Sequence, residues 1–298
     1  MTLPDHARTS IVVLTFNRRD EVLGTLRRLA STTPGAPVIV VDNGSQDGTA
    51  DAIRRHFPRV TLIAARWNHG AAGRNLGVEA VQTPYVAFCD DDTCWEPGAI
   101  DLAADILDGA PAVAVINARV LVGAAGVTDP TCELMAHSPL GRIAQGSLLL
   151  GFMAGACVMR TESFRAVGGY WRPFFIGGEE TLLALDIAAH GWQMVYARDV
   201  VTRHFPSPQR DAGQRRHLLV RNAIWTAWLR LPLGTAVHET LHALRAVPAM
   251  RARWHALRDA LAGADEVLRN RHVVPAHVER MHSLLRAHAA EPAARVPR

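Results

Sequence analysis

The sequence predicts an α/β fold, in which a mostly parallel, Rossmann-like sheet is flanked by helices and followed by a C-terminal helical extension. Two observations predict it. Continuous apolar runs alternate with helical spacing from residue 10 to residue 64, which is typical of parallel strands buried on both faces and joined by right-handed crossovers. Beyond residue 222 the apolar spacing is helical. We therefore divide the chain into an α/β domain, 1–222, and a helical extension, 223–298.

The first three strands are predicted in order along the chain. The apolar run 10–15 precedes helical spacing over 20–30, and the run 38–41 precedes a helix over 50–56. A third strand is expected at 60–64. Because the carboxyl ends of parallel strands face the ligand crevice of such a sheet, polar residues that end the first two strands or follow them are candidates for binding. These are Thr15, Asn17, Arg18 and Asp42.

Two further features belong to this first part of the chain. Asp42 follows four apolar residues, and a carboxylate in this place commonly holds a ribose hydroxyl or a base edge. The alternative is an Asx-turn that closes the strand. The glycine-rich segment 68–77 then leads into a helix, where Gly70 allows close backbone approach to a phosphate and Arg74 adds a bidentate donor.

Three consecutive carboxylates, Asp90, Asp91 and Asp92, end the apolar run 85–89. Like charges repel, so stability alone gives no reason to place three acids at the end of a strand. Binding of a divalent cation would explain the three acids, since Mg²⁺ and Mn²⁺ take hard oxygen ligands, often one or two carboxylates plus substrate phosphates. The alternative is an acidic cap, with Asp92 opening a helix after Pro97. This stretch by itself leaves both interpretations open.

The remainder of the α/β domain alternates less regularly. We expect strands at 113–122, 193–196 and 200–204, an irregular segment at 123–137, a small-residue strand and turn at 148–160, and a helix at 179–190. Glu179 and Glu180 open this helix, where the macrodipole favours acids in any protein.

Composition excludes several classes of site. There is no GxGxxG after the first strand, and all 32 basic residues are Arg, so a P-loop lysine is absent. The four cysteines, Cys89, Cys94, Cys132 and Cys157, have no zinc spacing and are expected to be buried, reduced thiols. Residues 1–10 are polar and lack a signal-peptide pattern, so we expect a cytoplasmic protein. We expect no nucleic-acid partner.

Positive charge is concentrated toward the C-terminus. Up to His204 there are 17 Arg and 21 acids, whereas from Phe205 onward there are 15 Arg and 7 acids. In this part the apolar residues Leu241, Leu244, Val247, Met250, Trp254, Leu257, Leu261 and Leu268 recur at helical spacing. We expect them to pack on the core. The alternative is an interfacial helix at the inner face of an anionic membrane. Residues 287–298 are predicted to be disordered.

Five linked motifs together resemble family 2 glycosyltransferases of the GT-A fold. In order they are Thr15-Phe16-Asn17-Arg18, Val41-Asp42-Asn43-Gly44-Ser45, Asp47-Gly48-Thr49, Asn68-x-Gly70-x-x-Gly73-Arg74-Asn75 and Phe88-Cys89-Asp90-Asp91-Asp92. The resemblance implies a nucleotide-sugar-binding half at about 9–100 and an acceptor half at about 101–222. The donor is then a UDP-, dTDP-, GDP- or CDP-sugar, and the acceptor bears a hydroxyl.

The resemblance also implies roles for individual residues. Asp90 and Asp92 match the DXD carboxylates that bind Mg²⁺ or Mn²⁺, and His204 matches an additional metal ligand of some members. Asp42 matches the contact to base or ribose, and Thr15 the first pocket residue. Asp91 is grouped with the cofactor-binding residues, although its side chain is expected to face solvent.

The segment Gly168-Gly169-Tyr170…Gly177-Gly178-Glu179-Glu180 resembles the family element that carries the general base. Transfer with inversion needs a carboxylate that takes the acceptor proton. The second acid of the pair maps to Glu180, which we assign as the base, with Glu179 as the alternative. Other functions compatible with the sequence are a nucleotidyltransferase acting on a sugar phosphate and a non-catalytic nucleotide-sugar-binding module.

Overall fold

The computed structural model describes residues 7–206 and 212–290. Its N-terminal part alternates strands and helices as predicted, and three parallel pairings join β1 to β2, β2 to β3 and β1 to β4. The elements are β1 (Thr9–Thr15), α1 (Arg19–Thr32), β2 (Val38–Asp42), α2 (Thr49–His56), β3 (Thr61–Ala64), the 3₁₀ turn η1 (Gly70–Ala72), α3 (Gly73–Glu79) and β4 (Tyr85–Asp90).

One mixed sheet runs through the α/β domain in the order β3-β2-β1-β4-β10-β6-β11-β9-β8, with β5 beside β11 and β7 beside β6. Its second half contains β5 (Thr93–Trp95), α4 (Ala99–Gly109), β6 (Val113–Val122), β7 (Val127–Thr128), α5 (Pro130–Ala136), β8 (Arg142–Ile143), β9 (Gly146–Leu149), η2 (Ala154–Ala156), β10 (Cys157–Arg160), α6 (Thr161–Ala166), η3 (Arg172–Phe174), α7 (Glu179–Ala189) and β11 (Gln193–His204). The predicted α/β architecture is confirmed.

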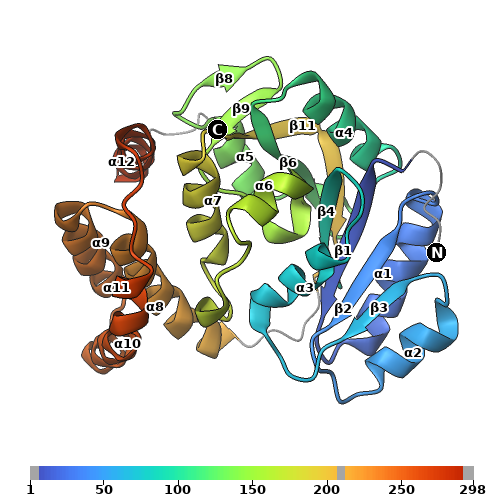
Figure 1. Cartoon of the computed structure of the whole chain (residues 1–298), viewed down its shortest axis with the longest axis horizontal. Coiled ribbons are helices and arrows are strands. Elements are labelled where there is room, and N and C mark those ends of the chain that lie inside the picture. Colours follow the sequence, from blue (N-terminus) through green and yellow to red (C-terminus); the bar gives the residue numbers. More distant parts are fainter. Residues whose placement is uncertain (1–6, 207–211, 291–298) are drawn as a thin grey trace.

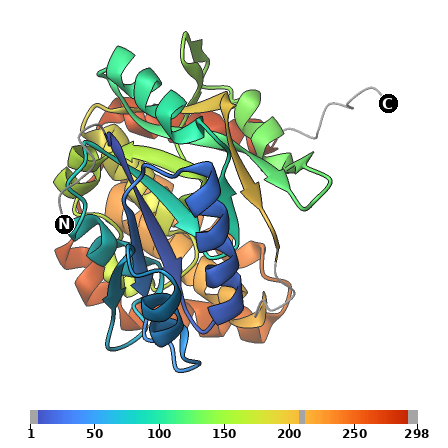
Figure 2. The ribbon, with the colours of Figure 1, turned by 90° about the vertical axis from the view of Figure 1, so that its right-hand side faces the viewer.

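Helices cover both faces of the sheet, because its strands are apolar on both sides. Along β1, Ile11 and Val13 point into a core shared with α1 and α4, while Val12 points into the core shared with α7. Figure 2 shows α1, in blue, in front of the sheet. The four cysteines are buried and unpaired with one another, as expected.

Five helices follow: α8 (Ala212–Arg230), α9 (Leu233–Arg245), α10 (Met250–Ala262), α11 (Ala264–Arg269) and α12 (Ala276–Ala290). They form a layer on the far side of α7 from the sheet (Figure 1). A third apolar cluster joins this layer to the α/β domain, since Phe174 and Leu182 pack with Trp225, Leu229 and Val267. The predicted domain boundary after residue 222 falls within α8. No helix among residues 7–206 and 212–290 has the length and apolar character needed to cross a membrane.

Several local predictions are wrong. The supposed irregular segment 123–137 contains β7 and α5, whose first turn is capped by the Asp129 carboxylate. The two strands expected at 193–196 and 200–204 are one strand, β11, whose pairing register with β6 shifts between Ala197 and Val201. Of the tail predicted to be disordered, residues 287–290 continue α12, and 291–298 lie outside the described residues.

The largest correction concerns the C-terminal apolar residues. We expected them to pack on the core, yet most of their large side chains are exposed to solvent. The exposed ones are Leu241, Met250, Trp254, Leu261 and Leu268. The core positions of these helices are taken instead by smaller side chains such as Ala236, Ala256 and Ala260.

Candidate active site

The three acids at the end of β4 point in different directions because the chain turns sharply between β4 and β5. The Asp90 N–H donates to the Thr93 hydroxyl (2.8 Å), which closes the turn. The Asp90 side chain remains 40% exposed, whereas those of Asp91 and Asp92 are almost fully buried. The acidic-cap interpretation is wrong, since Thr93–Trp95 form a strand and α4 begins only after Gly98.

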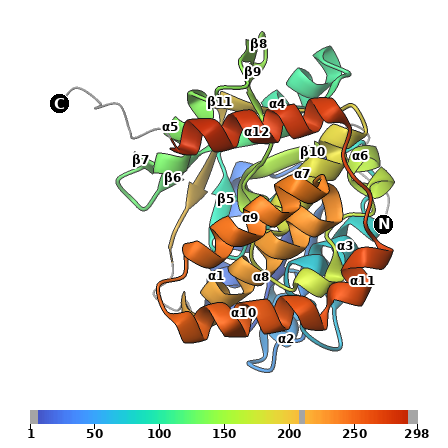
Figure 3. The ribbon, with the colours of Figure 1, turned by 90° about the vertical axis from the view of Figure 1, so that its left-hand side faces the viewer.

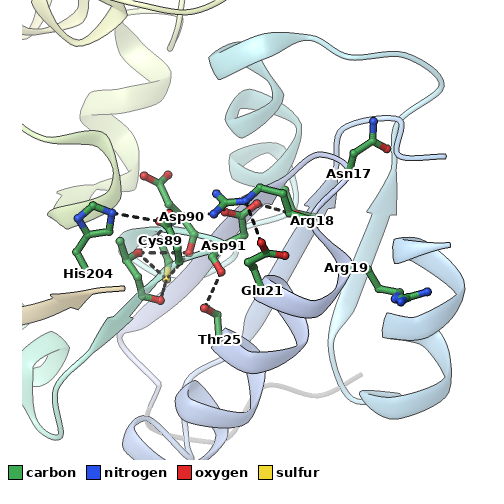
Figure 4. A network of polar contacts seen from close by, with 12 residues as sticks. Asn17, Arg18, Arg19, Glu21, Thr25, Cys89, Asp90, Asp91 and His204 are labelled. Carbon is green, nitrogen blue, oxygen red and sulfur yellow. Dashed lines mark hydrogen bonds and ion pairs between the residues drawn. The ribbon is translucent and has the colours of Figure 1, made fainter. Parts of the chain in front are cut away.

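Asp91 points inward, toward the start of α1, and the prediction that it faces solvent is wrong. It accepts hydrogen bonds from Arg18 and from the Thr15 hydroxyl (3.0 Å), and the Thr25 hydroxyl donates to its backbone carbonyl (2.8 Å). Figure 4 shows Arg18 and Thr25 on either side of it. Burial, together with the charges of Asp90 and Asp92, raises the pKa of Asp91 to about 7 despite the nearby guanidinium.

Asp92 has the opposite electrostatic balance. Its Oδ2 accepts from Arg18 (3.1 Å), and His204 Nε2 lies 3.6 Å from its Oδ1. Burial alone would raise the pKa of this carboxyl, but the hydrogen bond to His204 and the charge of Arg18 outweigh it and lower the pKa to about 2. Asp92 is therefore ionised at neutral pH.

Asp90 lies against Arg74, which reaches it from α3. The two side chains form an ion pair, with Arg74 almost fully buried beside the ring of Tyr170. Burial opposes the charge on Arg74, but the carboxylates of Asp90, Glu179 and Glu180 raise its pKa above the ordinary value. This guanidinium thus stands between the acids of β4 and those of α7.

The glycines of segment 68–77 lie in close contact with other parts of the protein. A Cβ on Gly73 would meet Leu14 and Asn43, and one on Gly77 would meet Val12 at 2.5 Å. Gly70 has φ +60, and a Cβ there would lie 1.9 Å from the carbonyl oxygen of Phe175. These glycines let α3 pack closely on β1 and on the loop that precedes α7.

The loops after β1 and β2 form the part of the sheet edge at which the sequence predicts nucleotide binding. Asp42 is buried, and its Oδ1 accepts from the N–H of Ser45 (3.1 Å), three residues further on, so its side chain closes the turn after β2. Asn17 has φ 52, and its Oδ1 accepts from the Gln46 N–H (2.8 Å), which ties the two loops together. A cavity of about 490 Å³ opens here, lined by Asn17, Arg18, Arg19, Asp20, Glu21 and Asp47.

Glu179 and Glu180 form the first turn of α7, after two glycines with positive φ, Gly177 and Gly178. Glu179 is buried. Removal from water, and then the negative charge of Glu179, raises the pKa of Glu180 to about 7. Asp90 and Arg74 also act on this carboxyl. The structure therefore brings the predicted base beside the predicted metal-binding acid.

Some contributors to this arrangement were not predicted. Asn222 on α8 donates to the carbonyls of Phe174 (3.0 Å), Ile176 (3.2 Å) and Gly177 (2.6 Å), which fixes the loop before Glu179. A Cβ on Gly155 would lie 2.5 Å from the Asp90 carboxylate, so this glycine leaves the space that Asp90 occupies. Neither role could be predicted from the sequence, because each residue acts on residues more than 40 positions away.

The predicted metal ligands Asp90, Asp92 and His204 lie at the same end of the sheet. Among the residues that the structure describes, however, no group of three or more His, Cys, Asp or Glu side chains is arranged to hold a metal ion.

With this geometry in place, comparison with known proteins gives the family. The family model for glycosyl transferase family 2 matches residues 10–168, more than half of the chain. The chain belongs to that family. It is therefore a glycosyltransferase, as its motifs predict, and the two other functions considered from the sequence are not favoured.

The relatives identified are distant. An N-acetylglucosaminyl-diphospho-decaprenol L-rhamnosyltransferase of Mycobacterium tuberculosis is 24% identical over 72% of this chain and 83% of its own. A pre-mycofactocin glycosyltransferase of the same species is 25% identical over 89% of this chain and 61% of its own. A mannosyltransferase of Pyrobaculum calidifontis, solved with GDP-Man and Mn²⁺, superposes with a TM-score of 0.58 over 96% of this chain and 87% of its own, at 19% identity. The last likeness shows the GT-A fold.

Proposed function

We propose that this glycosyltransferase moves a sugar from a nucleotide-sugar to a hydroxyl acceptor, with inversion at the anomeric carbon and Glu180 as general base. The observation that carries the proposal is the placement of Glu180. Its carboxyl has a pKa of about 7, and it shares the electrostatic environment of Arg74 with Asp90. A base with this pKa is matched to removing a hydroxyl proton near neutral pH.

The donor is proposed to lie along the carboxyl edge of β1, β2 and β4. The loops after β1 and β2 are held together by Asn17 and border the cavity beside Arg18. Asp42 would accept from the base or ribose with the oxygen that Ser45 does not use. Thr15 and Arg18 are proposed to act indirectly. Both donate hydrogen bonds to the Asp91 carboxylate and so hold the turn that positions Asp90.

A divalent cation, Mg²⁺ or Mn²⁺, fits the donor set at the end of β4. Asp90 offers a partly exposed carboxylate, and Asp92 Oδ1 lies 3.6 Å from His204 Nε2. Carboxylate oxygen and imidazole nitrogen are both ligands that Mn²⁺ accepts. Such ions commonly use only one or two carboxylates plus substrate phosphates, in keeping with the absence of a three-residue cluster among the described residues. When bound, the ion would offset the charge of the leaving diphosphate.

The reaction at the acceptor is proposed to need only Glu180 from the protein. Its carboxylate takes the hydroxyl proton while the acceptor oxygen forms a bond to the anomeric carbon. The bond from that carbon to the diphosphate oxygen breaks on the opposite face, and the nucleoside diphosphate leaves with the electron pair. Glu179, buried beside Glu180, raises the proton affinity of the base.

The test is a screen of UDP-, dTDP-, GDP- and CDP-sugars with Mn²⁺ and candidate acceptors, including lipid-linked saccharides. Release of a nucleoside diphosphate, together with a product of inverted anomeric configuration by NMR, is the expected result. Release of pyrophosphate would contradict sugar transfer, and retention of configuration would contradict the role of Glu180.

A further inference from the structure

The outer surface of α9 and α10 carries six large apolar side chains that the fold does not cover. Leu233, Val237 and Leu241 recur every four residues along α9, and Met250, Trp254 and Leu261 lie along α10. Leu233, Met250, Trp254 and Leu261 are each more than 60% exposed. We call these six side chains the apolar surface. Large apolar patches that stay exposed on a soluble protein mark sites that bind another protein or a membrane.

The orientation of α9 follows from its contacts. Ala236 is fully buried, and Trp228 of α8 donates to Thr240 (3.0 Å), so this side of α9 faces α8. Thr235 donates to Glu279 (2.9 Å), which places α12 on a second side. The stripe Leu233, Val237 and Leu241 lies on the flank away from α12.

Figure 3 shows α10 on that same flank of α9, with α8 visible between the two helices. On α10 the buried residues are Ala256 and Ala260, and Trp225 of α8 donates to the Ala260 carbonyl (2.9 Å). Trp254 and Leu261 project from another side of the helix, about 100° to 160° around its axis from these alanines. The six side chains of the apolar surface therefore lie on the sides of α9 and α10 that α8 does not cover.

The exposed charges on α9 and α10 themselves are mostly positive. Residues 233–262 contain four arginines and three histidines but only two acids. Both acids are engaged within the protein, since Glu239 bonds Arg286 (3.0 Å) and Asp259 bonds His217 (2.7 Å). Arg245, Arg251 and Arg258 are exposed; Arg258 also lies 3.3 Å from Asp259. A ligand for this surface must be apolar at its centre and anionic at its edge.

We propose that α9 and α10 form an interfacial docking surface for anionic phospholipid membranes, with Trp254 and Leu261 entering the headgroup region and the arginines contacting lipid phosphates. Trp and Leu on one side of a helix with Arg beside them is the composition of helices that lie in the membrane plane. The surface is distinct from the carboxyl edge of the sheet, so the proposal goes beyond the glycosyltransferase reaction and does not depend on it.

The experiment is co-sedimentation of the full chain with vesicles, without sugar substrates. We expect binding to equimolar phosphatidylglycerol and phosphatidylcholine, no binding to phosphatidylcholine alone, and weaker binding as salt is raised. Trp254→Gln is expected to abolish binding. Arg251→Gln and Arg258→Gln should each lower the partition coefficient about fivefold. Because these side chains are exposed, the melting temperature should not change.

The matched control is Trp67→Gln, because Trp67 is similarly exposed but lies in the α/β domain, after β3. This variant should bind vesicles as the unaltered chain does. Failure of the unaltered chain to bind anionic vesicles would overturn the proposal, as would equal losses in Trp67→Gln and Trp254→Gln. A dimer in sedimentation velocity that Trp254→Gln dissociates would assign the surface to a second copy of the chain instead.

Discussion

Asp92, in the turn after β4, and Glu180, in the first turn of α7, lie in one candidate site but are held in opposite electrostatic states. Asp92 is buried beside Arg18 and His204, which lower its pKa to about 2. Glu180 is removed from water beside another carboxylate, Glu179, and its pKa rises to about 7. The position of an acid at a strand or helix end does not decide whether it is charged. Its charge state is decided by the charged groups that other elements place beside it.

This difference in pKa suits the two carboxyl groups to different chemical roles. A carboxylate that stays ionised at all working pH values is suited to positive partners, and one that gains a proton near neutral pH is suited to proton transfer. Arg74 is common to both regions, because it forms an ion pair with Asp90 and because the charges of Glu179 and Glu180 raise its pKa. Substitutions that affect only one region should therefore have distinguishable effects.

The largest effect is expected for Glu180→Gln, which removes the proposed base while keeping the shape of the side chain. Turnover should fall by about 10²- to 10⁴-fold, measured as nucleoside diphosphate released in the presence of acceptor. Glu179→Gln is the matched control, with a smaller loss. If Glu179→Gln proves the more damaging change, Glu179 is the base.

The next effect tests the acids of β4. Asp90→Asn removes the half-exposed carboxylate, and we expect turnover to fall about 100-fold, a loss typical of weakened stabilisation of the leaving group. Chelation by EDTA should also stop the reaction and abolish the thermal stabilisation that a nucleoside diphosphate gives with Mn²⁺. Asp101→Asn, at an exposed acid on α4, is the control. Full activity in EDTA would show that the reaction is metal-independent.

A moderate effect is expected when Asp90 is displaced rather than removed. In Gly155→Ala the new methyl group would lie 2.5 Å from the Asp90 carboxylate, which must then move. Turnover should fall about tenfold, since small displacements of catalytic groups are costly. Gly151→Ala adds the same group where no atom lies within 4 Å, and activity should be retained. Equal activity of the two variants would show that Asp90 need not be positioned exactly.

The smallest effects concern pH. Because Glu180 must be ionised to act as a base, kcat/KM should fall about tenfold per unit below pH 7. Glu179→Gln should move this midpoint lower, since loss of a neighbouring negative charge lowers the pKa of Glu180. An unchanged midpoint would mean that another group titrates.

Stability should depend on the same carboxyl. Its pKa in the folded protein, about 7, is above the ordinary value of 4.5, so its stabilising contribution is full below pH 4.5 and is lost as the pH rises to 7. The melting temperature of Glu180→Gln relative to the unaltered protein should therefore rise over this range. A constant difference from pH 4.5 to pH 8 would contradict the raised pKa.

The sequence by itself determined the order of strands and helices in the first 100 residues, the carboxyl-edge positions of Asp42 and Asp90, and the helix that Glu180 opens. These features are local: apolar periodicity distinguishes strand from helix, and a strand ends where its apolar run stops. The family motifs are local in the same sense, which is why family membership could be predicted from the residues.

Only the tertiary structure decided which way the acids face and which are charged. Asp91 points inward because Arg18, 73 positions earlier, and Thr15 meet it there. Likewise, the apolar spacing of α9 and α10 does not say which residues are covered, since small alanines fill the contact with α8 and leave Trp254 and Leu261 outside. Burial and pKa depend on distant segments that a local pattern does not specify, and those segments set the chemistry of this site.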